Sequence, residues 1–281
     1  MVMAEPEKEN LFSYTPSETL ALLAAGLFGV SAIVHLAVMI RKRTWFYMAL
    51  VVGSFMMTGG YVSRFLSAKN PDNIGLYIAQ SILILLPPSL YAATIYMIYG
   101  RIVHYVNAPE ASVIRPTRVT KIFVAGDIFA FQVQGAGGGL MGKAENADLG
   151  KKILLVGLFA QLLFFGFFLI IAIIFDRRMV NNAKLYSVPR HGKHGWRKLL
   201  TLLLVAAVII IARCVYRMIE VGGGHDGYLM THEWVMYVFD GAPMMVVQAL
   251  FHFVHAGDVF GRGGAVKREG LDEDYIALNG V

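Results

Sequence analysis

Residues 213–255, RCVYRMIEVGGGHDGYLMTHEWVMYVFDGAPMMVVQALFHFVH, decide what kind of fold this chain adopts. The stretch holds two apolar segments long enough to cross a bilayer, and both carry charges. The charged or titratable residues in or beside these segments are Arg213, Arg217, Glu220, Glu233, Asp240, His252 and His255. Ions survive in hydrocarbon where they pair with one another or line a polar interior. The stretch therefore predicts a polytopic membrane protein whose bundle has a polar interior.

The composition of the whole chain agrees with this prediction. Its 281 residues are 57% hydrophobic and 16% charged, with a mean hydropathy of +0.58. Soluble domains average about 25% charged residues, so the chain lies outside that class. A single cysteine, Cys214, excludes an internal disulfide framework, and its apolar surroundings indicate a packing role.

Apolar segments of about 20 residues predict seven transmembrane helices and an all-α fold. The expected spans are 17–40, 45–66, 75–100, 121–141, 152–175, 198–219 and 231–255. All seven have the length of a helix, which excludes a barrel of short strands. We take residues 1–258 as one transmembrane domain and residues 259–281, which are Gly-rich and mixed in charge, as a disordered cytosolic tail.

The distribution of Lys and Arg predicts the orientation of the bundle. Of the 25 basic residues, 17 lie in the C-terminal tail and in the loops after spans one, three and five, whereas 6 lie on the other side. Cytosolic loops carry the excess of Lys and Arg, so we expect the N-terminus outside and the C-terminus in the cytosol. Because topology and anionic lipid explain these charges, nucleic acid is not an expected partner.

Polar side chains recur at helical spacing in the outer halves of spans six and seven. They are Arg213, Arg217 and Glu220 in span six and Glu233, Tyr237 and Asp240 in span seven. Each set follows i, i+4 and i+7, which places it on one face and predicts arginine–carboxylate pairs between the two spans. The pairs either only fasten the helices or border a cavity in which arginine holds a phosphate or carboxylate. Arg64 of span two either joins this group or reaches for the membrane interface.

Span four, GDIFAFQVQGAGGGLMG over residues 126–142, holds a lone carboxylate. Asp127 and Gln134 are seven residues apart and share a face, and a Gly run follows at 135–139. The Gly run allows either close helix packing or a locally broken backbone beside a ligand. A carboxylate inside a span is rarely idle, so Asp127 is the strongest single candidate for a ligand-binding residue.

Two prolines interrupt span three. Pro87 and Pro88 remove two backbone donors and predict a kink, which either shapes a cavity or only bends the helix. The tyrosines that follow, Tyr91, Tyr96 and Tyr99, are expected to be interface anchors rather than ligands.

Histidines near the cytosolic end offer an alternative, metal-binding interpretation. The candidate zinc ligands are His35, Asp127, His252 and His255. The i, i+3 spacing of His252 and His255 suits one metal poorly, because i, i+4 is the usual spacing on a helix. The simpler interpretation is interfacial histidines bonded to backbone or water. We expect no cofactor, with zinc or haem kept as alternatives.

Four segments carry a family resemblance. They are GGYVSRFL (59–66), LLPPSLYAATIYMIYGRI (85–102), VAGDIFAFQVQGAGGG (124–139) and YRMIEVGGGHDGYLMTHEWVMYVFDGAPM (216–244). Together they resemble the fungal lipid-translocating exporter family, also called RTA-like after resistance to 7-aminocholesterol, over about residues 17–258. The chain departs from that family in span two: it has Met57 at a position where relatives often carry Glu. It departs again where they end span seven with His-Pro-Gly, here His255-Ala256-Gly257, which predicts a straighter helix end.

The resemblance implies a seven-helix protein linked to release of sphingoid bases, tolerance of sterol-like compounds and porphyrin handling. It favours a plasma-membrane protein, or one of the vacuole or another endomembrane, that translocates an amphipathic lipid rather than an enzyme. Partners are then membrane lipids and an amphipathic small molecule. The expected ligand-binding residues are Asp127, Gln134, Arg64, Arg213, Arg217, Glu220, Glu233 and Asp240. The alternatives are a metal-dependent lipid amide hydrolase, a seven-helix lipid receptor or sensor, and a porphyrin- or haem-binding protein.

Overall fold

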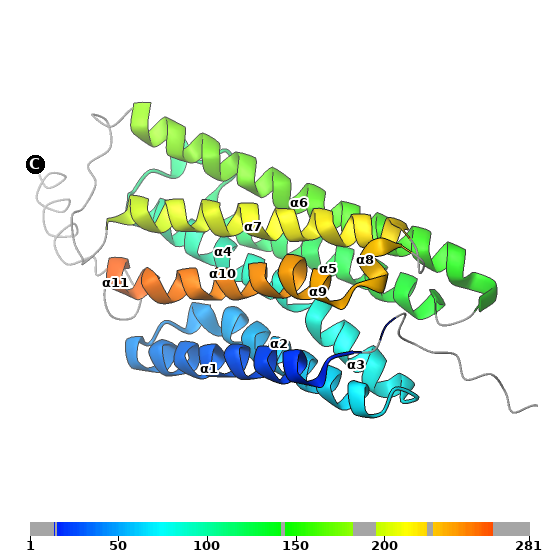
Figure 1. The fold of residues 1–281 in the computed structure, drawn as a ribbon. Coiled ribbons are helices and arrows are strands. Elements are labelled where there is room, and N and C mark those ends of the chain that lie inside the picture. The colour runs from blue at the N-terminus through cyan, green and yellow to red at the C-terminus, as the bar shows by residue number, and fades with distance from the viewer. Residues whose placement is uncertain (1–13, 15, 142–143, 182–194, 224–226, 261–281) are drawn as a thin grey trace, which may run out of the picture.

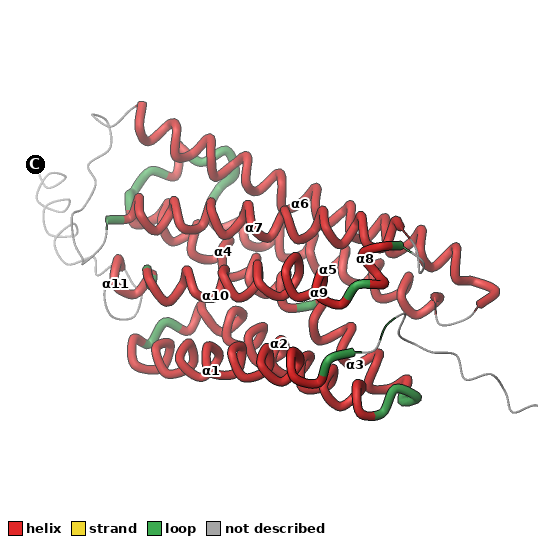
Figure 2. Tube along the Cα trace, in the orientation of Figure 1, coloured by secondary structure: helices red, strands yellow, loops and turns green. Residues whose placement is uncertain are grey.

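The fold is a bundle of long helices that lie roughly side by side (Figure 1). The structure, a computed structural model, describes residues 14, 16–141, 144–181, 195–223 and 227–260. These residues form helices and loops and no strand, as Figure 2 shows by colour, which confirms the predicted all-α class for this part of the chain. The long helices are α1 (Glu18–Lys42), α2 (Met48–Lys69), α3 (Ile74–Leu85), α4 (Pro87–Tyr105), α5 (Pro116–Met141), α6 (Ala147–Asn181), α7 (Trp196–Gly223) and α10 (Ala242–Phe253).

Short elements join or end these helices. They are η1 (Trp45–Tyr47), η2 (Pro109–Ala111), η3 (Ala144–Asn146), α8 (Tyr228–Thr231), α9 (Glu233–Met236), η4 (Tyr237–Gly241) and α11 (Ala256–Phe260). Lys42 at the end of α1 is 2.6 Å from Asp258 of α11, so this ion pair ties the last described helix to one end of the bundle. Of the tail expected to be disordered, residues 259–281, the first two belong to α11. Residues 261–281 lie outside the described residues, so for them the disorder stays a prediction.

Six of the helical segments are long and apolar enough to cross a membrane. They are Glu18–Lys42, Trp45–Lys69, Ile74–Tyr105, Ala147–Asn181, Trp196–Gly223 and Glu233–Phe260. The remaining expected span, span four at 121–141, corresponds to α5, which begins at Pro116, five residues earlier than predicted, and is not one of these six. Proline is well placed at the first helical position because the N–H that it lacks would have no partner there.

The outward surface of the bundle is apolar along its length. On α6 the exposed side chains include Val156, Phe159, Leu163, Phe167 and Ile170, which recur every three or four residues. Such a stripe on the outside of a helix is unfavourable in water and is typical of a helix that faces lipid. Together with the six apolar segments, the stripe indicates an integral membrane protein.

The two prolines of the third span end one helix and begin the next. α3 ends at Leu85 and α4 begins at Pro87, because neither Pro87 nor Pro88 has an N–H to donate to the preceding turn. The carbonyl of Ile84 would be the helical partner of residue 88 and therefore lacks its usual donor. The predicted interruption is confirmed, and it exposes a backbone acceptor inside the bundle.

The last span is also interrupted, in two places. Tyr237–Gly241 forms a π-helical turn before Pro243, and Val254 adopts an extended conformation with φ −128° and ψ 96°. The expectation of a straighter end is wrong: α10 stops at Phe253, and α11 begins three residues later. His255 therefore lies beyond the helix and does not share a helical face with His252.

The Gly run of α5 serves close packing. The helix continues without a break from Pro116 to Met141, so the broken-backbone alternative is not what the structure shows. A Cβ on Gly137 would lie 2.4 Å from the backbone nitrogen of Leu154 of α6. By contrast, a Cβ on Gly138 would have no heavy atom within 4 Å. Only part of the run faces the neighbouring helix, and that part brings the two backbones together.

Candidate functional site

A buried ion-pair cluster joins α7 to η4. The carboxylate of Asp240 accepts from the guanidinium groups of both Arg213 and Arg217, and Arg217 also pairs with Glu220 at 2.8 Å. Asp240 is 0% exposed and Arg213 is 2% exposed. The arginine–carboxylate pairing that the i, i+4, i+7 spacing predicts between spans six and seven is therefore present. We call Arg213, Arg217, Glu220 and Asp240 the arginine cluster.

Arg213 also makes a hydrogen bond to the backbone that was not predicted from the sequence. It donates from Nη2 to the carbonyl oxygen of Ile84 at 3.1 Å. This is the carbonyl that Pro88 leaves without a helical donor. An unpaired buried carbonyl costs about 1–3 kcal/mol, so the arginine compensates for the proline interruption. The two features are coupled: the double proline provides an acceptor, and a buried arginine on α7 satisfies it.

The π-helical turn determines how Asp240 approaches the cluster. A π turn places one extra residue in the helix and rotates the side chains around it. In the same turn, a Cβ on Gly241 would lie 2.4 Å from the hydroxyl oxygen of Tyr61. Glycine at this position therefore lets α2 lie directly against the turn that carries Asp240.

A second ion pair lies beside the arginine cluster and ties three helical segments together. Arg64 of α2 is 2.8 Å from Glu233 of α9 and donates to the hydroxyl groups of Tyr14 and Tyr237. Glu233 also accepts from the backbone N–H of Ser17, the residue before α1, at 2.8 Å. Arg64 is 3% exposed, so it lies inside the bundle and is not an interface arginine.

A line of neutral polar groups lies deeper in the bundle. Gln134 of α5 donates to the side-chain oxygen of Gln161 of α6 at 2.8 Å, and Gln161 donates to Ser89 of α4 at 3.0 Å. All three helices meet at this level. Gln161 is not among the residues predicted for the site, although it is the single glutamine of the apolar span 152–175, which is the signal that could have indicated it.

Asp127 is in a different environment from the other buried carboxylates. Its Oδ2 accepts from the hydroxyl of Tyr96 at 2.9 Å, whereas its Oδ1 has no hydrogen-bond partner among the described residues. The tyrosine lies among the rings of Phe123, Phe165 and Phe168, with centroids 4.7–5.8 Å from its own. Asp127 is 3% exposed and makes no ion pair in the part of the chain that the structure describes.

The tyrosines of α4 belong to the interior. Tyr91, Tyr96 and Tyr99 are each 0% exposed, so the expectation that they are interface anchors is wrong. Their hydroxyl groups contact Gln248, Asp127 and Ser112, respectively. The physical reason is that α4 is surrounded by other helices, and each buried hydroxyl has found a polar partner within the bundle.

The proposed metal ligands do not form one cluster. His35 stacks on His252 with ring centroids 3.7 Å apart, His255 stacks on Tyr47 at 4.2 Å, and Asp127 bonds to Tyr96. Within the described residues, no group of three or more His, Cys, Asp or Glu side chains could hold a metal ion. The zinc alternative on His35, Asp127, His252 and His255 therefore has no geometric support.

Charge balance distinguishes the parts of the interior. Arg213 and Arg217 offset Asp240 and Glu220, and Arg64 offsets Glu233. Among the described residues, Asp127 is the buried carboxylate to which no cation is paired. A buried charge without a partner is costly, so a cationic ligand at Asp127 would supply what the protein lacks.

Comparison with known proteins identifies relatives along most of the chain. The profile of the family described as "RTA1 like protein" matches residues 50–263. Protoporphyrin uptake protein 1 of Saccharomyces cerevisiae is 38% identical over 79% of this chain and 71% of its own length. Protein RTA1 of the same organism is 33% identical over 86% of this chain and 83% of its own length. The sphingoid long-chain base transporter RSB1, also from Saccharomyces cerevisiae, is 23% identical over 83% of this chain and 70% of its own length. No solved structure matches the chain significantly.

Proposed function

Because this chain belongs to the RTA1-like family of membrane proteins, we propose that it binds an amphipathic lipid and moves it across the membrane. The ligand class that the interior suits is a long-chain compound with a cationic amine, as in a sphingoid base. One relative carries sphingoid base transport in its name. Plasma membrane is the location that we propose for this activity.

The unpaired carboxylate of Asp127 carries the proposal. Every other buried carboxylate named above already has an arginine partner, and one oxygen of Asp127 is free in the described part of the chain. A primary ammonium group donates three hydrogen bonds and prefers charged oxygen acceptors. The ring of Tyr96 and its phenylalanine neighbours provide the aromatic surroundings that favour a cation.

The proposed route runs along the polar line of the bundle. Ser89, Gln134 and Gln161 lie between the arginine cluster and Asp127 along α4, α5 and α6, and they offer exchangeable hydrogen bonds to a head group. Asp127 itself is buried in the conformation described here, so an amine reaches it only when helices separate. The interruption at Pro87 and Pro88 gives the third span a point about which its outer part, α3, can move.

The proposed topology has seven spans, with the N-terminus outside and the C-terminus in the cytosol. α5 is span four and adds one span to the six named above: its 26 residues extend about 39 Å, which suffices to cross the hydrocarbon core. Gly137 of its Gly run and its polar side chains Asp127 and Gln134, which lower its apolarity, face α4 and α6. An odd number of spans agrees with the 17-to-6 split of basic residues.

The test replaces Asp127 by asparagine. Asn keeps the size of the side chain and an acceptor for Tyr96, but it removes the negative charge. We expect the melting temperature to stay the same or rise, and binding of a sphingoid base to the purified protein to weaken at least about tenfold. The matched control is Asp176→Asn in α6. The carboxylate of Asp176 is partly exposed and lies 3.5 Å from Arg197, so this variant should bind the sphingoid base normally.

Either of two results would overturn the proposal. One is normal binding and release of sphingoid base by a normally folded Asp127→Asn protein. The other is a loss of melting temperature in Asp127→Asn with unchanged binding per folded molecule, because the residue would then only fasten α5 to α4.

A porphyrin is the second candidate ligand, because a relative named for protoporphyrin uptake is 38% identical to this chain. Protoporphyrin carries carboxylates rather than an amine. Its binding should therefore not depend on the negative charge of Asp127. Measuring both ligands with the same Asp127→Asn protein separates the candidates: loss of sphingoid base binding alone favours the amine, and retention of both favours the porphyrin.

A further inference from the structure

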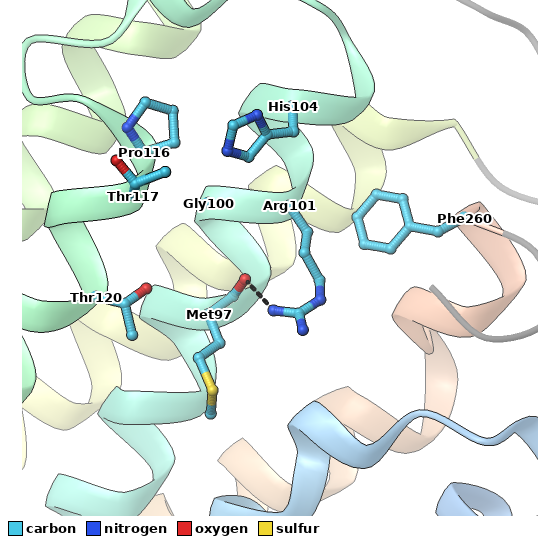
Figure 3. A pocket seen from close by; sticks show the side chains of 8 residues that line it. All are labelled: Met97, Gly100, Arg101, His104, Pro116, Thr117, Thr120 and Phe260. Atoms are coloured by element: carbon cyan, nitrogen blue, oxygen red, sulfur yellow. Dashed lines mark hydrogen bonds between the residues drawn. The ribbon is translucent and has the colours of Figure 1, made fainter. Parts of the chain in front are cut away.

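A separate cavity lies at the end of the bundle where α4 ends and α5 begins (Figure 3). It has a volume of about 390 Å³ and is bordered by residues of α4, by the first turns of α5 and by Phe260 of α11. In the proposed topology this is the cytosolic end. The cavity is separate from the sites described above, because neither Asp127 nor any residue of the arginine cluster lines it.

Arg101 is the main polar feature of the cavity. Its guanidinium stacks on the ring of Phe46 at 4.1 Å and donates from Nη1 to the carbonyl of Met97 at 3.1 Å. Arg101 makes no ion pair with a described carboxylate, although arginines of the interior such as Arg64 and Arg213 do. The stack and the single hydrogen bond fix the guanidinium plane and leave the other N–H groups available for a ligand.

The remaining polar groups of the cavity are suited to an anion. His104 lies one turn after Arg101 on α4, and the hydroxyl-bearing Thr117 and Thr120 come from α5, as Figure 3 shows. Thr120 makes only a long bond, 3.4 Å, to the carbonyl of Tyr96, which a stronger acceptor can replace. None of the described residues that line the cavity is acidic.

Side chains, rather than the start of a helix, would hold the anion. The backbone N–H groups of Arg118 and Val119, in the first turn of α5, both already donate to the carbonyl of Arg115. Apolar surface is also present, because Met97 and Phe260 line the same cavity. The combination of a fixed guanidinium, hydroxyl groups and apolar walls fits a phosphate group attached to a glycerol or acyl portion.

We propose that this cavity binds a phosphate monoester group, held by Arg101, at the cytosolic end of the bundle. The group can come from an anionic lipid head group of the inner leaflet or from free phosphate. Its binding does not depend on the ligand of Asp127, so the two proposals succeed or fail separately.

The test measures binding to the purified full-length protein in detergent. The probes are short-chain phosphatidic acid, phosphatidylcholine with the same chains, and inorganic phosphate. We expect phosphatidic acid to bind, and Arg101→Gln to weaken it about tenfold. Arg118→Gln is the matched control, because Arg118 is exposed and does not line the cavity, and it should change binding less than about twofold.

Each outcome bears on the proposal. Binding of inorganic phosphate with the same dependence on Arg101 would support the site and assign free phosphate as its source. Equal losses in Arg101→Gln and Arg118→Gln would overturn the site in favour of general surface attraction. Equal binding of phosphatidylcholine, or no binding of either phosphate probe, would overturn it as well.

Discussion

Replacing Asp240 by asparagine removes one negative charge from the arginine cluster while keeping the size of the side chain. In the native protein Asp240 balances Arg213 directly and shares Arg217 with Glu220. The substitution leaves two guanidinium groups facing one carboxylate, in a region where Asp240 is 0% exposed. Breaking a buried pair by removing one partner costs about 3–5 kcal/mol, and we expect a loss of this size in the free energy of unfolding.

The magnitude can be checked against an exposed ion pair in the same protein. Glu18 of α1 and Lys69 of α2 are 3.9 Å apart, and their side chains are 51% and 50% exposed. An exposed pair contributes about 0–1 kcal/mol, so Glu18→Gln should change the free energy of unfolding very little. Unfolding by a denaturing detergent in mixed micelles, followed by circular dichroism, measures both variants on one scale.

A compensating variant tests the cause of the loss. Arg213→Gln combined with Asp240→Asn restores the charge balance, because Arg217 keeps Glu220. The glutamine amide can donate hydrogen bonds, but it is shorter than arginine and reaches the carbonyl of Ile84 less well. We therefore expect partial recovery. If Asp240→Asn is as stable as Glu18→Gln, the reasoning is wrong and water must reach the cluster.

Further predictions follow from the packing and the topology. Gly137→Ala should lower the melting temperature, because its Cβ would lie 2.4 Å from backbone of α6, whereas Gly138→Ala meets no atom within 4 Å and should raise stability by up to about 1 kcal/mol. Arg64→Gln should cost less free energy of unfolding than Asp240→Asn, because the Glu233 side chain that it leaves behind is 13% exposed. In intact cells, an N-terminal tag should be accessible from outside and a C-terminal tag should be protected; the reverse pattern would refute the proposed orientation.

Spacing rules predicted the parts of the site that depend on one helix at a time. Arg213, Arg217 and Glu220 share a face because a helix repeats every 3.6 residues, and their partner Asp240 could be expected on the facing helix. The same rules could not reveal which neighbours meet across helices. The bond between Asp127 and Tyr96 depends on how α4 and α5 pack, and no pattern within either segment contains that information.

Local breaks in the helices were the hardest features to predict in detail. The two prolines predicted the interruption between α3 and α4, but no residue near them in the sequence indicated which donor would bond to the carbonyl of Ile84. That partner, Arg213, comes from a helix more than a hundred residues later in the chain. The π turn that carries Asp240 and the extended Val254 likewise have no counterpart in the patterns that the sequence analysis used.

The interruption between α3 and α4 also bears on how the bundle could move. Arg213 bonds both to Asp240 and to the carbonyl of Ile84, so it links the broken third span to the π turn of the last span. Any motion of the outer part of that third span, α3, must either carry Arg213 along or break its bond to Ile84. Ser89 lies just after the break and contacts Gln161, one step from Gln134 on the helix of Asp127. A displacement at the prolines would therefore disturb the arginine cluster and the polar line together, which is the coupling that the proposed transport through Asp127 would require.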